Sequence, residues 1–415
     1  MYCYFLLDRL VFCANCFWQF KRYVIFQYRQ WRKTMKIVIA SDSFKESLSS
    51  VEVANYFRQG WEQFSPQKVE FDIISMADGG EGTSEALQHA LGTEEIQVPA
   101  HDPLMKPITA SMHISKKHST AVIDVASASG LDKIPEGERN PSLATSYGTG
   151  ELIKACLDYD IDRILIGLGG SGTNDGGAGM LQALGGKLLD NNHQELPYGG
   201  VFLKQLDTLD MTSLDPRLAK KEIIGLCDVD NPLTGPRGAS YTFGPQKGAS
   251  EAVMASLEKA LSTFGKVLST YTNKAVGEQP HMGAAGGLAA GLAGCLKGRL
   301  ESGISFILKE NNFYERVQGA SLVITGEGKI DFQSAFGKTP VGVAKAVQKI
   351  NPSIPVIAIC GQLGEGFESV YEEGITAVFS VSEGPSTLQE ALKDSKNLLA
   401  HLAGNLSKFY GQMMN

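Results

Sequence analysis

The 415-residue sequence lacks the features that mark several common classes of protein. It contains no stretch of 18 or more apolar residues, which excludes a polytopic membrane protein. The net charge is −7, so positive charge is not in excess. A general nucleic-acid binder needs a basic face to attract phosphate, and the charge argues against this class of protein. We therefore expect neither a membrane nor a nucleic acid as a partner.

Cysteine is also scarce, with seven in the whole chain. Cys156, Cys227, Cys295 and Cys360 stand singly in the body of the sequence, which fits a reducing compartment better than a disulfide framework. We therefore expect a cytoplasmic protein. Hydrophobic residues make up 43% of the chain and charged residues 20%, as in ordinary soluble globular proteins, and the length allows roughly two or three domains.

The first 34 residues differ in composition from the rest. They contain eleven aromatic residues, and six basic residues against the single acid Asp8. Met35 then precedes the apolar run 36–40, which is how many soluble α/β chains begin. We interpret residues 1–34 as an extension that is not part of the fold, translated from an upstream start codon. A membrane-surface anchor is the alternative, because basic and aromatic residues suit an interface.

From residue 35 onward, short apolar runs alternate with segments of helical periodicity. This alternation is typical of an α/β protein with a mostly parallel sheet. The first predicted helix opens with Ser49 and has Glu52 three residues later, which is the pattern of a capping box. The predicted strands are 36–41, 69–76, 119–126, 162–168, 222–228, 320–325, 355–360 and 375–381, and the predicted helices are 50–64, 83–91, 148–158, 176–185, 251–270, 284–297, 338–349 and 386–408.

Several predicted strands are followed by a loop that contains both glycine or serine and an acidic residue. These loops are 41–45, 78–83, 169–177, 228–235 and 326–331. In a parallel sheet, ligands bind beyond the carboxyl ends of the strands, and glycines there let backbone N–H groups turn toward an anion. Acids beside such loops would repel a bare phosphate, so the combination favours a Mg²⁺ ion between carboxylate and phosphate.

One of these loops also matches the dinucleotide-binding pattern GxGxxG. The match runs from Gly167 to Gly172 after a predicted strand, and Asp190 follows 18 residues further on. It leaves a nicotinamide-dependent oxidoreductase as an alternative function. Asp175, at the start of the following helix, weakens this alternative because its charge would face a pyrophosphate unfavourably without a metal.

Eight motifs along the chain carry a family resemblance. They are SDSFKESL (41–48), ADGGEGT (77–83), TSYGTGELI (145–153), GLGGSGTNDGGAGML (167–181), NPLTGPRGA (231–239), FGPQKGA (243–249), GAAGGL (283–288) and TGEGKIDFQSAFGKTPVGVA (325–344). In combination they resemble the bacterial class I glycerate kinase family, from about Met35 to the C-terminus. Two departures are small, namely Gly172 where the family has alanine and Glu46 where glycine is common.

The resemblance implies ATP-dependent phosphorylation of glycerate in organic-acid and sugar-acid catabolism, including glyoxylate breakdown, with 2-phosphoglycerate favoured over 3-phosphoglycerate as the product. It also implies a two-domain α/β fold, with a Rossmann-like parallel sheet layer and an inserted flavodoxin-like α/β domain. From the chain order we expect residues 35–95 and 285–415 to form the first domain and residues 96–284 to form the insert. Association into a homo-oligomer is left open.

The chemistry that the resemblance implies depends on positioning and charge neutralisation more than on covalent steps. The implied catalytic residues are Asp175, Asp78 and Lys45, with Asp175 expected to accept the proton of the attacking hydroxyl. The acids expected to hold Mg²⁺ are Asp42, Asp78 and Glu327. The residues expected to bind ATP are Gly79, Gly80, Gly169, Gly170, Gly286, Gly326, Lys247 and Lys338, and those expected to bind glycerate are Ser43, Arg237 and Lys329.

Overall fold

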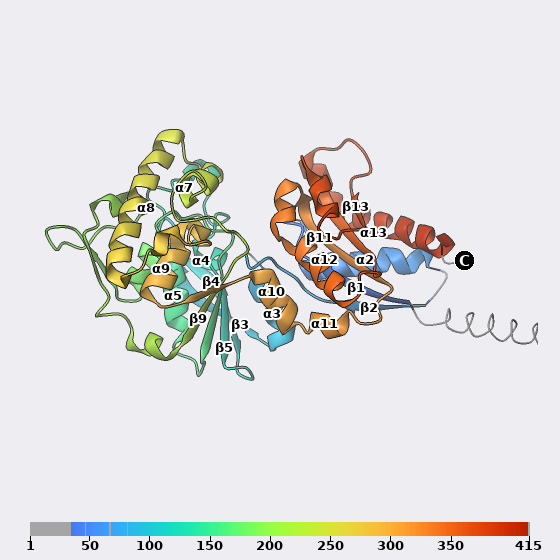
Figure 1. Ribbon diagram of the computed structural model, residues 1–415, viewed down its shortest axis with the longest axis horizontal. Coiled ribbons are helices and arrows are strands. Elements are labelled where there is room, and N and C mark those ends of the chain that lie inside the picture. Colours follow the sequence, from blue (N-terminus) through green and yellow to red (C-terminus); the bar gives the residue numbers. More distant parts are fainter. Residues whose placement is uncertain (1–34, 46, 66–67, 81, 414–415) are drawn as a thin grey trace, which may run out of the picture.

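The computed structural model describes residues 35–413, apart from residues 46, 66, 67 and 81. Two β-sheets with flanking helices make up the molecule, one toward each end of its long axis (Figure 1). Mixed α/β structure with parallel sheets is therefore confirmed. The interpretation of residues 1–34 lies outside the described residues. Within the part of the chain that the structure describes, no helix is both long and apolar enough to cross a membrane.

The first sheet has five strands, all parallel, in the order β13-β12-β11-β1-β2. Alternate residues of β1 enter different cores: Ile37 and Ile39 join an apolar cluster with α2 and α13, whereas Val38 and Ala40 join one with α12. Both faces are thus covered, as is usual for a parallel sheet. The elements are β1 Met35–Ser41, α2 Ser50–Phe64, β2 Val69–Ile73, β11 Leu322–Ile330, α12 Thr339–Ile350, β12 Val356–Leu363, β13 Ala377–Ser380 and α13 Leu388–Met413.

The second sheet has six strands in the order β10-β9-β6-β5-β4-β3, of which β5, β6, β9 and β10 run parallel and β4 runs antiparallel to both of its neighbours. A separate two-stranded ribbon joins β7 and β8. The elements of this part are β3 Glu94–His101, β4 Pro107–Ser115, β5 Thr120–Asp124, α4 Ala126–Ser129, α5 Tyr147–Cys156, β6 Arg163–Gly167, α6 Ala178–Ala183, β7 Lys187–Leu189, β8 Thr208–Asp210, β9 Glu222–Leu226, α7 Ala239–Phe243, α8 Glu251–Thr272, α9 Leu288–Cys295 and β10 Arg299–Glu301.

The capping box predicted at the start of the first helix is confirmed. The backbone N–H of Glu52 donates to the Ser49 hydroxyl at 3.3 Å, and the Glu52 carboxylate accepts from the backbone N–H of Ser49 at 3.0 Å. The helix α2 then buries Phe57 and Trp61 against α13 and the sheet. Local sequence and tertiary packing therefore agree on where this helix begins.

Three of the six strands of the second sheet, β3, β4 and β10, are not predicted from the sequence. The edge strand β3 alternates polar residues with Ile96 and Val98 and contains Pro99, which is tolerated at an edge but weakens the strand signal. The domain boundary expected at residue 285 also differs from the strand pairing. Arg299 of β10 pairs with Ile224 of β9, so β10 lies in the six-stranded sheet.

The chain passes between the two sheets twice, through residues 74–93 and 302–321. The passages contain α3 Thr83–Leu91, α10 Gly303–Glu310 and α11 Phe313–Arg316. They touch at two glycines: a Cβ atom added to Gly303 would lie only 2.2 Å from the Cα of Gly79. The backbone N–H of Leu168 donates to the carbonyl of Gly79 at 2.9 Å, which joins this contact to the end of β6. The second sheet is thereby fixed against the loop that follows β2.

Candidate active site

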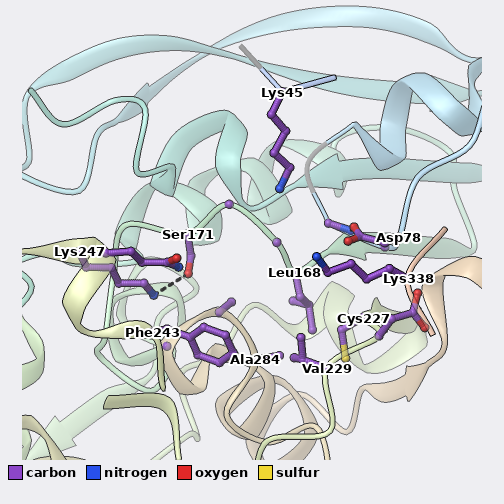
Figure 2. Close-up of a pocket in the computed structure, with 18 residues that line it drawn as sticks. Lys45, Asp78, Leu168, Ser171, Cys227, Val229, Phe243, Lys247, Ala284 and Lys338 are labelled. Carbon is purple, nitrogen blue, oxygen red and sulfur yellow. Dashed lines mark hydrogen bonds between the residues drawn. The ribbon is translucent and has the colours of Figure 1, made fainter. Parts of the chain in front are cut away.

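Two cavities open beyond the carboxyl ends of the parallel strands, where the sequence predicted a ligand site. The first, of about 210 Å³, we call the glycine-lined cavity (Figure 2). The second, of about 370 Å³, we call the α13 cavity. Both are lined by Lys45 from the loop after β1, Asp78 from the loop after β2 and Lys338 from the start of α12. Two cations and one carboxylate thus form a wall that the cavities share.

The glycine-lined cavity is built mainly by loops of the six-stranded sheet. Most of the residues predicted to bind ATP line it, and the Lys247 ammonium lies at its wall beside Ser171 (Figure 2). At Gly286, with φ +66°, a Cβ atom would lie 2.0 Å from the carbonyl oxygen of Thr173, so this glycine allows two loops to approach closely. The predicted residues found here are Lys45, Asp78, Gly79, Gly80, Gly169, Gly170, Lys247, Gly286 and Lys338.

The α13 cavity is built by the five-stranded sheet and the first turns of α13. Its apolar wall includes Leu388, Leu392 and Leu398, which face strand-end residues of β11 and β12. The predicted residues found here are Asp42, Ser43, Lys45, Asp78, Glu327, Lys329 and Lys338. Residues that are far apart in the sequence therefore line the same cavity.

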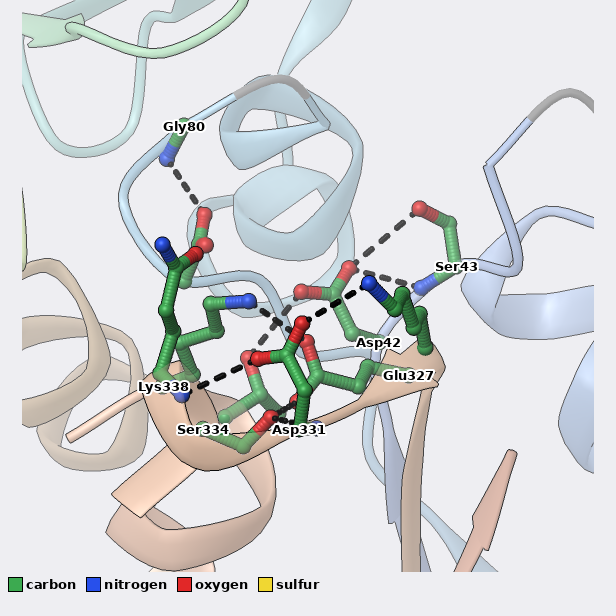
Figure 3. A network of polar contacts seen from close by, with 11 residues as sticks. Asp42, Ser43, Gly80, Glu327, Asp331, Ser334 and Lys338 are labelled. Carbon is green, nitrogen blue, oxygen red and sulfur yellow. Dashed lines mark hydrogen bonds and ion pairs between the residues drawn. The ribbon is translucent and has the colours of Figure 1, made fainter. Parts of the chain in front are cut away.

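Two carboxyl groups, of the buried Asp42 and the half-buried Asp78, lie at or near the shared wall. Asp42 is 9% exposed, and its carboxylate accepts from the backbone N–H of Ser43 at 2.6 Å and from the Thr339 hydroxyl at 3.0 Å (Figure 3). Burial, together with the negative charge of Asp78, raises the pKa of Asp42 to about 8, although these hydrogen bonds and Lys45 oppose the rise. The Asp78 carboxylate accepts from the backbone N–H of Gly80 at 3.0 Å.

Glu327 and Lys338 form an ion pair at the other side of the shared wall. The Lys338 ammonium lies 3.5 Å from the Glu327 carboxylate, which also accepts a hydrogen bond from Ser334 at 2.5 Å (Figure 3). Burial raises the pKa of Glu327 and Lys338 lowers it. Lys329, further along β11, pairs with Asp331 at 3.1 Å. The cavity therefore contains cations that already have carboxylate partners.

Asp228 lines the glycine-lined cavity. The sequence identifies its strand-end loop, 228–235, but does not predict Asp228 as a site residue. It accepts from the Ser302 hydroxyl at 2.6 Å and from the backbone N–H of Ile304 at 2.8 Å, at the start of α10. Burial, aided by the charge of Asp78, raises its pKa to about 6, while these hydrogen bonds lower it. The strand-end position of this acid was the signal that could have identified it.

Three predicted residues line neither cavity. The Asp175 side chain is fully buried, and its carboxylate accepts from the backbone and hydroxyl of Ser146, both at 2.8 Å, and from the backbone N–H groups of Gly177 and Gly179, both at 3.1 Å. Arg237 is exposed and pairs with Asp230 at 2.7 Å. The third residue, Gly326, packs against β12. The Asp175 carboxylate therefore organises a loop and lines neither of the two cavities.

The predicted metal ligands do not form a protein-only metal centre. Across residues 35–413, leaving out the few undescribed positions, no three His, Cys, Asp or Glu side chains gather as they would around a metal ion. Mg²⁺ commonly takes only one or two protein carboxylates and completes its shell with water and phosphate oxygens. The elevated pKa of Asp42 beside Asp78 is the expected property of a carboxylate pair that a cation would stabilise. The donor set therefore fits Mg²⁺ brought by a nucleotide.

The acid of the dinucleotide-binding pattern has a local structural role. Asp190 follows β7, and its carboxylate accepts from the backbone N–H groups of Asn192 and Gln194, both at 2.8 Å. It lines neither of the two cavities. The pattern from Gly167 to Gly172 therefore lacks the ribose-binding partner that a nicotinamide site requires.

Comparison with known proteins identifies the family. A sequence model of the glycerate kinase family matches residues 37–411. A glycerate kinase of Halalkalibacterium halodurans is 43% identical over 89% of this chain and 97% of its own length, and a glycerate 2-kinase of Escherichia coli is 44% identical over 90% and 97%. A crystal structure from Salmonella typhimurium LT2, whose protein is described as a glycerate kinase 2, has a TM-score of 0.77 and 40% identity, covering 91% of this chain and 98% of that one.

The chain therefore belongs to the glycerate kinase family, and the family resemblance inferred from its motifs is confirmed. The family model begins at residue 37 and ends at residue 411. No relative or structure supports the oxidoreductase alternative.

Proposed function

We propose that this protein transfers the γ-phosphoryl group of ATP to a hydroxyl of glycerate. The observation that carries the proposal is the shared wall of Lys45, Asp78 and Lys338, where two cavities meet. A phosphotransferase must hold a donor and an acceptor on opposite sides of the transferred group, and two joined cavities provide such an arrangement. The relatives named glycerate kinase support glycerate as the acceptor.

In the proposed reaction, the glycerate hydroxyl oxygen attacks the γ-phosphorus of ATP, a new P–O bond forms, and the bond to the bridging oxygen of ADP breaks. Asp78 accepts the hydroxyl proton, a role expected to accelerate transfer by roughly 10²–10⁴-fold. Lys45 and Lys338 neutralise the charge of the phosphoryl oxygens. Water excluded from the joined cavities cannot compete with glycerate for the phosphoryl group.

Mg²⁺ bound to ATP would neutralise phosphate charge, and Asp42 and Glu327 are the residues that would hold it in the α13 cavity. Removal of divalent cations by a chelator is expected to abolish turnover. Asp42→Asn is expected to raise the Mg²⁺ concentration needed for half-maximal rate by roughly 10-fold, because one of two carboxylate ligands is lost. The test is a titration of rate against Mg²⁺ at saturating glycerate.

The activity itself is tested by ADP release that depends on D-glycerate, with ³¹P NMR of the product. A 2-phosphoglycerate resonance is expected, and a 3-phosphoglycerate resonance would correct the position of transfer. Absorbance change of NADH with glycerate, but no ADP release, would contradict the proposal.

Several finer expectations remain part of this proposal. Residues 94–301, which contribute every strand of the six-stranded sheet, would form the flavodoxin-like insert, and the five-stranded sheet would form the Rossmann-like domain. The enzyme would act in the cytoplasm in sugar-acid and glyoxylate catabolism. Gel filtration with light scattering would decide whether it forms a homo-oligomer.

A further inference from the structure

Lys247 is a buried cation without a carboxylate partner. It ends the short helix Pro245–Lys247, is 2% exposed, and lines the glycine-lined cavity. Its ammonium donates to the Ser171 hydroxyl at 2.9 Å and to the carbonyl of Thr173 at 2.6 Å. Within residues 35–413, omitting the undescribed positions, no acid lies within ion-pair distance of it. An ammonium has three donors, so one donor remains for a ligand.

The charges around Lys247 do not compensate its own. Asp175 favours the ammonium from beyond ion-pair distance, but its carboxylate already accepts two hydrogen bonds from Ser146 and two from backbone N–H groups of its own loop. The Arg139 guanidinium donates to the carbonyl of the neighbouring Gln246 at 3.4 Å. Burial lowers the pKa of Lys247 to about 7 against the attraction of Asp175. The other titratable groups that line the cavity are Lys45, Asp78, Cys227, Asp228 and Lys338.

Keeping an unpaired ammonium buried in a cavity wall is unfavourable unless an anion binds beside it. Half of the residues that line the cavity are glycine, alanine, serine or cysteine, beside the apolar Leu168, Val229 and Phe243. The backbone at Gly79, Gly170 and Gly286 adopts positive φ. Such a cavity suits a small anion with little apolar surface. The larger α13 cavity instead presents Leu388, Leu392 and their neighbours, which suit the apolar faces of a nucleoside.

We propose that Lys247 binds the carboxylate of the hydroxy-acid substrate, so that the glycine-lined cavity holds glycerate and the α13 cavity holds the nucleoside of ATP. This inference rests on the proposed function and adds which ligand each cavity takes. It replaces the expectations from the sequence that Lys247 and the glycines of this cavity bind ATP, and that Ser43, Arg237 and Lys329 bind glycerate. The glycerate hydroxyls then lie toward the shared wall, where Asp78 and the two other lysines are located.

The first test separates the two substrates kinetically. Lys247→Met keeps an unbranched side chain and removes the charge, and it is expected to raise KM for glycerate by about 10- to 100-fold while KM for ATP stays within about twofold. Lys247→Arg keeps the charge and should recover part of the loss. Leu392→Glu, in the other cavity, is the reciprocal variant and should raise KM for ATP alone. A rise in KM for ATP with unchanged KM for glycerate in Lys247→Met would overturn the assignment.

The second test begins with the wild-type protein, so its main result does not depend on how a variant folds. D-glycerate is titrated into the wild-type full chain without ATP, by calorimetry at pH 8.5 in Tris and in HEPES, whose ionisation enthalpies differ. Because bound carboxylate favours the charged lysine, binding should take up close to one proton and should weaken as the pH rises from 7 to 9. Lys247→Met should bind weakly and take up none.

Absence of proton uptake by the wild type, or the same uptake by the variant, would overturn the inference. Glycerate-dependent ADP release by the wild type is measured alongside. If ADP is released but the carboxylate tests fail, the proposed function stands and only the cavity assignment fails. If no glycerate-dependent ADP is released, the proposed function itself fails.

Discussion

The loops after β2 and β6 have the same kind of sequence but place their aspartates in opposite environments. Both follow a parallel strand, both are rich in glycine, and both lead into a helix. Asp78 of the first loop lines both cavities and accepts one hydrogen bond from its own loop. Asp175 of the second loop is fully buried and accepts four.

The difference shows what makes a strand-end acid available for chemistry. A carboxylate that accepts several hydrogen bonds from backbone and hydroxyl donors is held in place, and its capacity to accept a substrate proton is reduced. A carboxylate with few internal donors in a cavity wall remains free to accept one. The composition of a loop therefore predicts where a site lies, whereas the hydrogen-bond partners decide which acid acts in it.

The largest expected effect is on turnover, through Asp78. Asp78→Asn keeps the shape and its hydrogen bond from Gly80 but loses the charge, so kcat is expected to fall by roughly 10² or more with little change in melting temperature. Steady-state kinetics at saturating ATP, Mg²⁺ and glycerate, with a thermal melt, provide the measurement. Normal kcat in a folded Asp78→Asn protein would remove the distinction between the two loops.

The second effect is on stability, through Asp175. Asp175→Asn places an amide where backbone N–H groups of Gly177 and Gly179 donate, and it should reduce the free energy of unfolding by about 1.5–3 kcal/mol. The kcat of the folded variant should stay within a few-fold of normal. The two asparagine variants serve as each other's controls, because a fall in kcat without loss of stability at Asp175 would restore the catalytic role predicted from the sequence.

A third effect is the pH dependence of stability, through Lys247. Its pKa of about 7 in the folded protein is below the ordinary 10.5, so between these values the unfolded chain binds more protons than the folded one. The free energy of unfolding should therefore rise by about 1–3 kcal/mol between pH 7 and pH 9, and this rise should be absent in Lys247→Met. Urea unfolding at pH 7 and pH 9, without ligands, measures the difference, and equal slopes for the two proteins would contradict it.

The smallest expected effect concerns residues 1–34. A chain that begins at Met35 should retain the melting temperature and kcat of the full chain, because the family match begins at residue 37 and, among the residues that the structure describes, none before Asp42 lines either cavity. Parallel melts and assays of both chains test this. Insolubility of the shorter chain would show that the extension contributes to folding.

Regular elements were predicted well where local signals were strong. The bounds of α2 and α3 match the prediction, since Ser49 and Glu52 cap the first and glycines flank the second. The strand β3 was missed because its alternation and Pro99 give a weak signal, and its partner β4 became a strand only through tertiary pairing. The placement of β10 likewise depends on pairing with β9, which chain order does not reveal.

Most of the site residues predicted from the sequence line the two cavities, but the sequence does not show which of them lie together. Motif recognition found Lys45, Asp78 and Lys338, yet their meeting at one wall depends on how three distant segments pack. Nothing in the local sequence indicates that Asp175 faces inward, because its partner Ser146 lies 29 residues earlier. Burial of Lys247 is likewise a property of the packed loops.

The contact between Gly79 and Gly303 links the angle between the two sheets to the distances between the carboxylates at the shared wall. Because the carbonyl of Gly79 accepts a hydrogen bond from Leu168 at the end of β6, the neighbouring Asp78 is held against the six-stranded sheet, whereas Asp42 follows β1 and Glu327 lies in β11 of the other sheet. Any rotation of one sheet against the other changes the spacing between these carboxylates. In the proposed reaction, an arrangement with the two sheets further apart would therefore separate the carboxylates that the transfer requires.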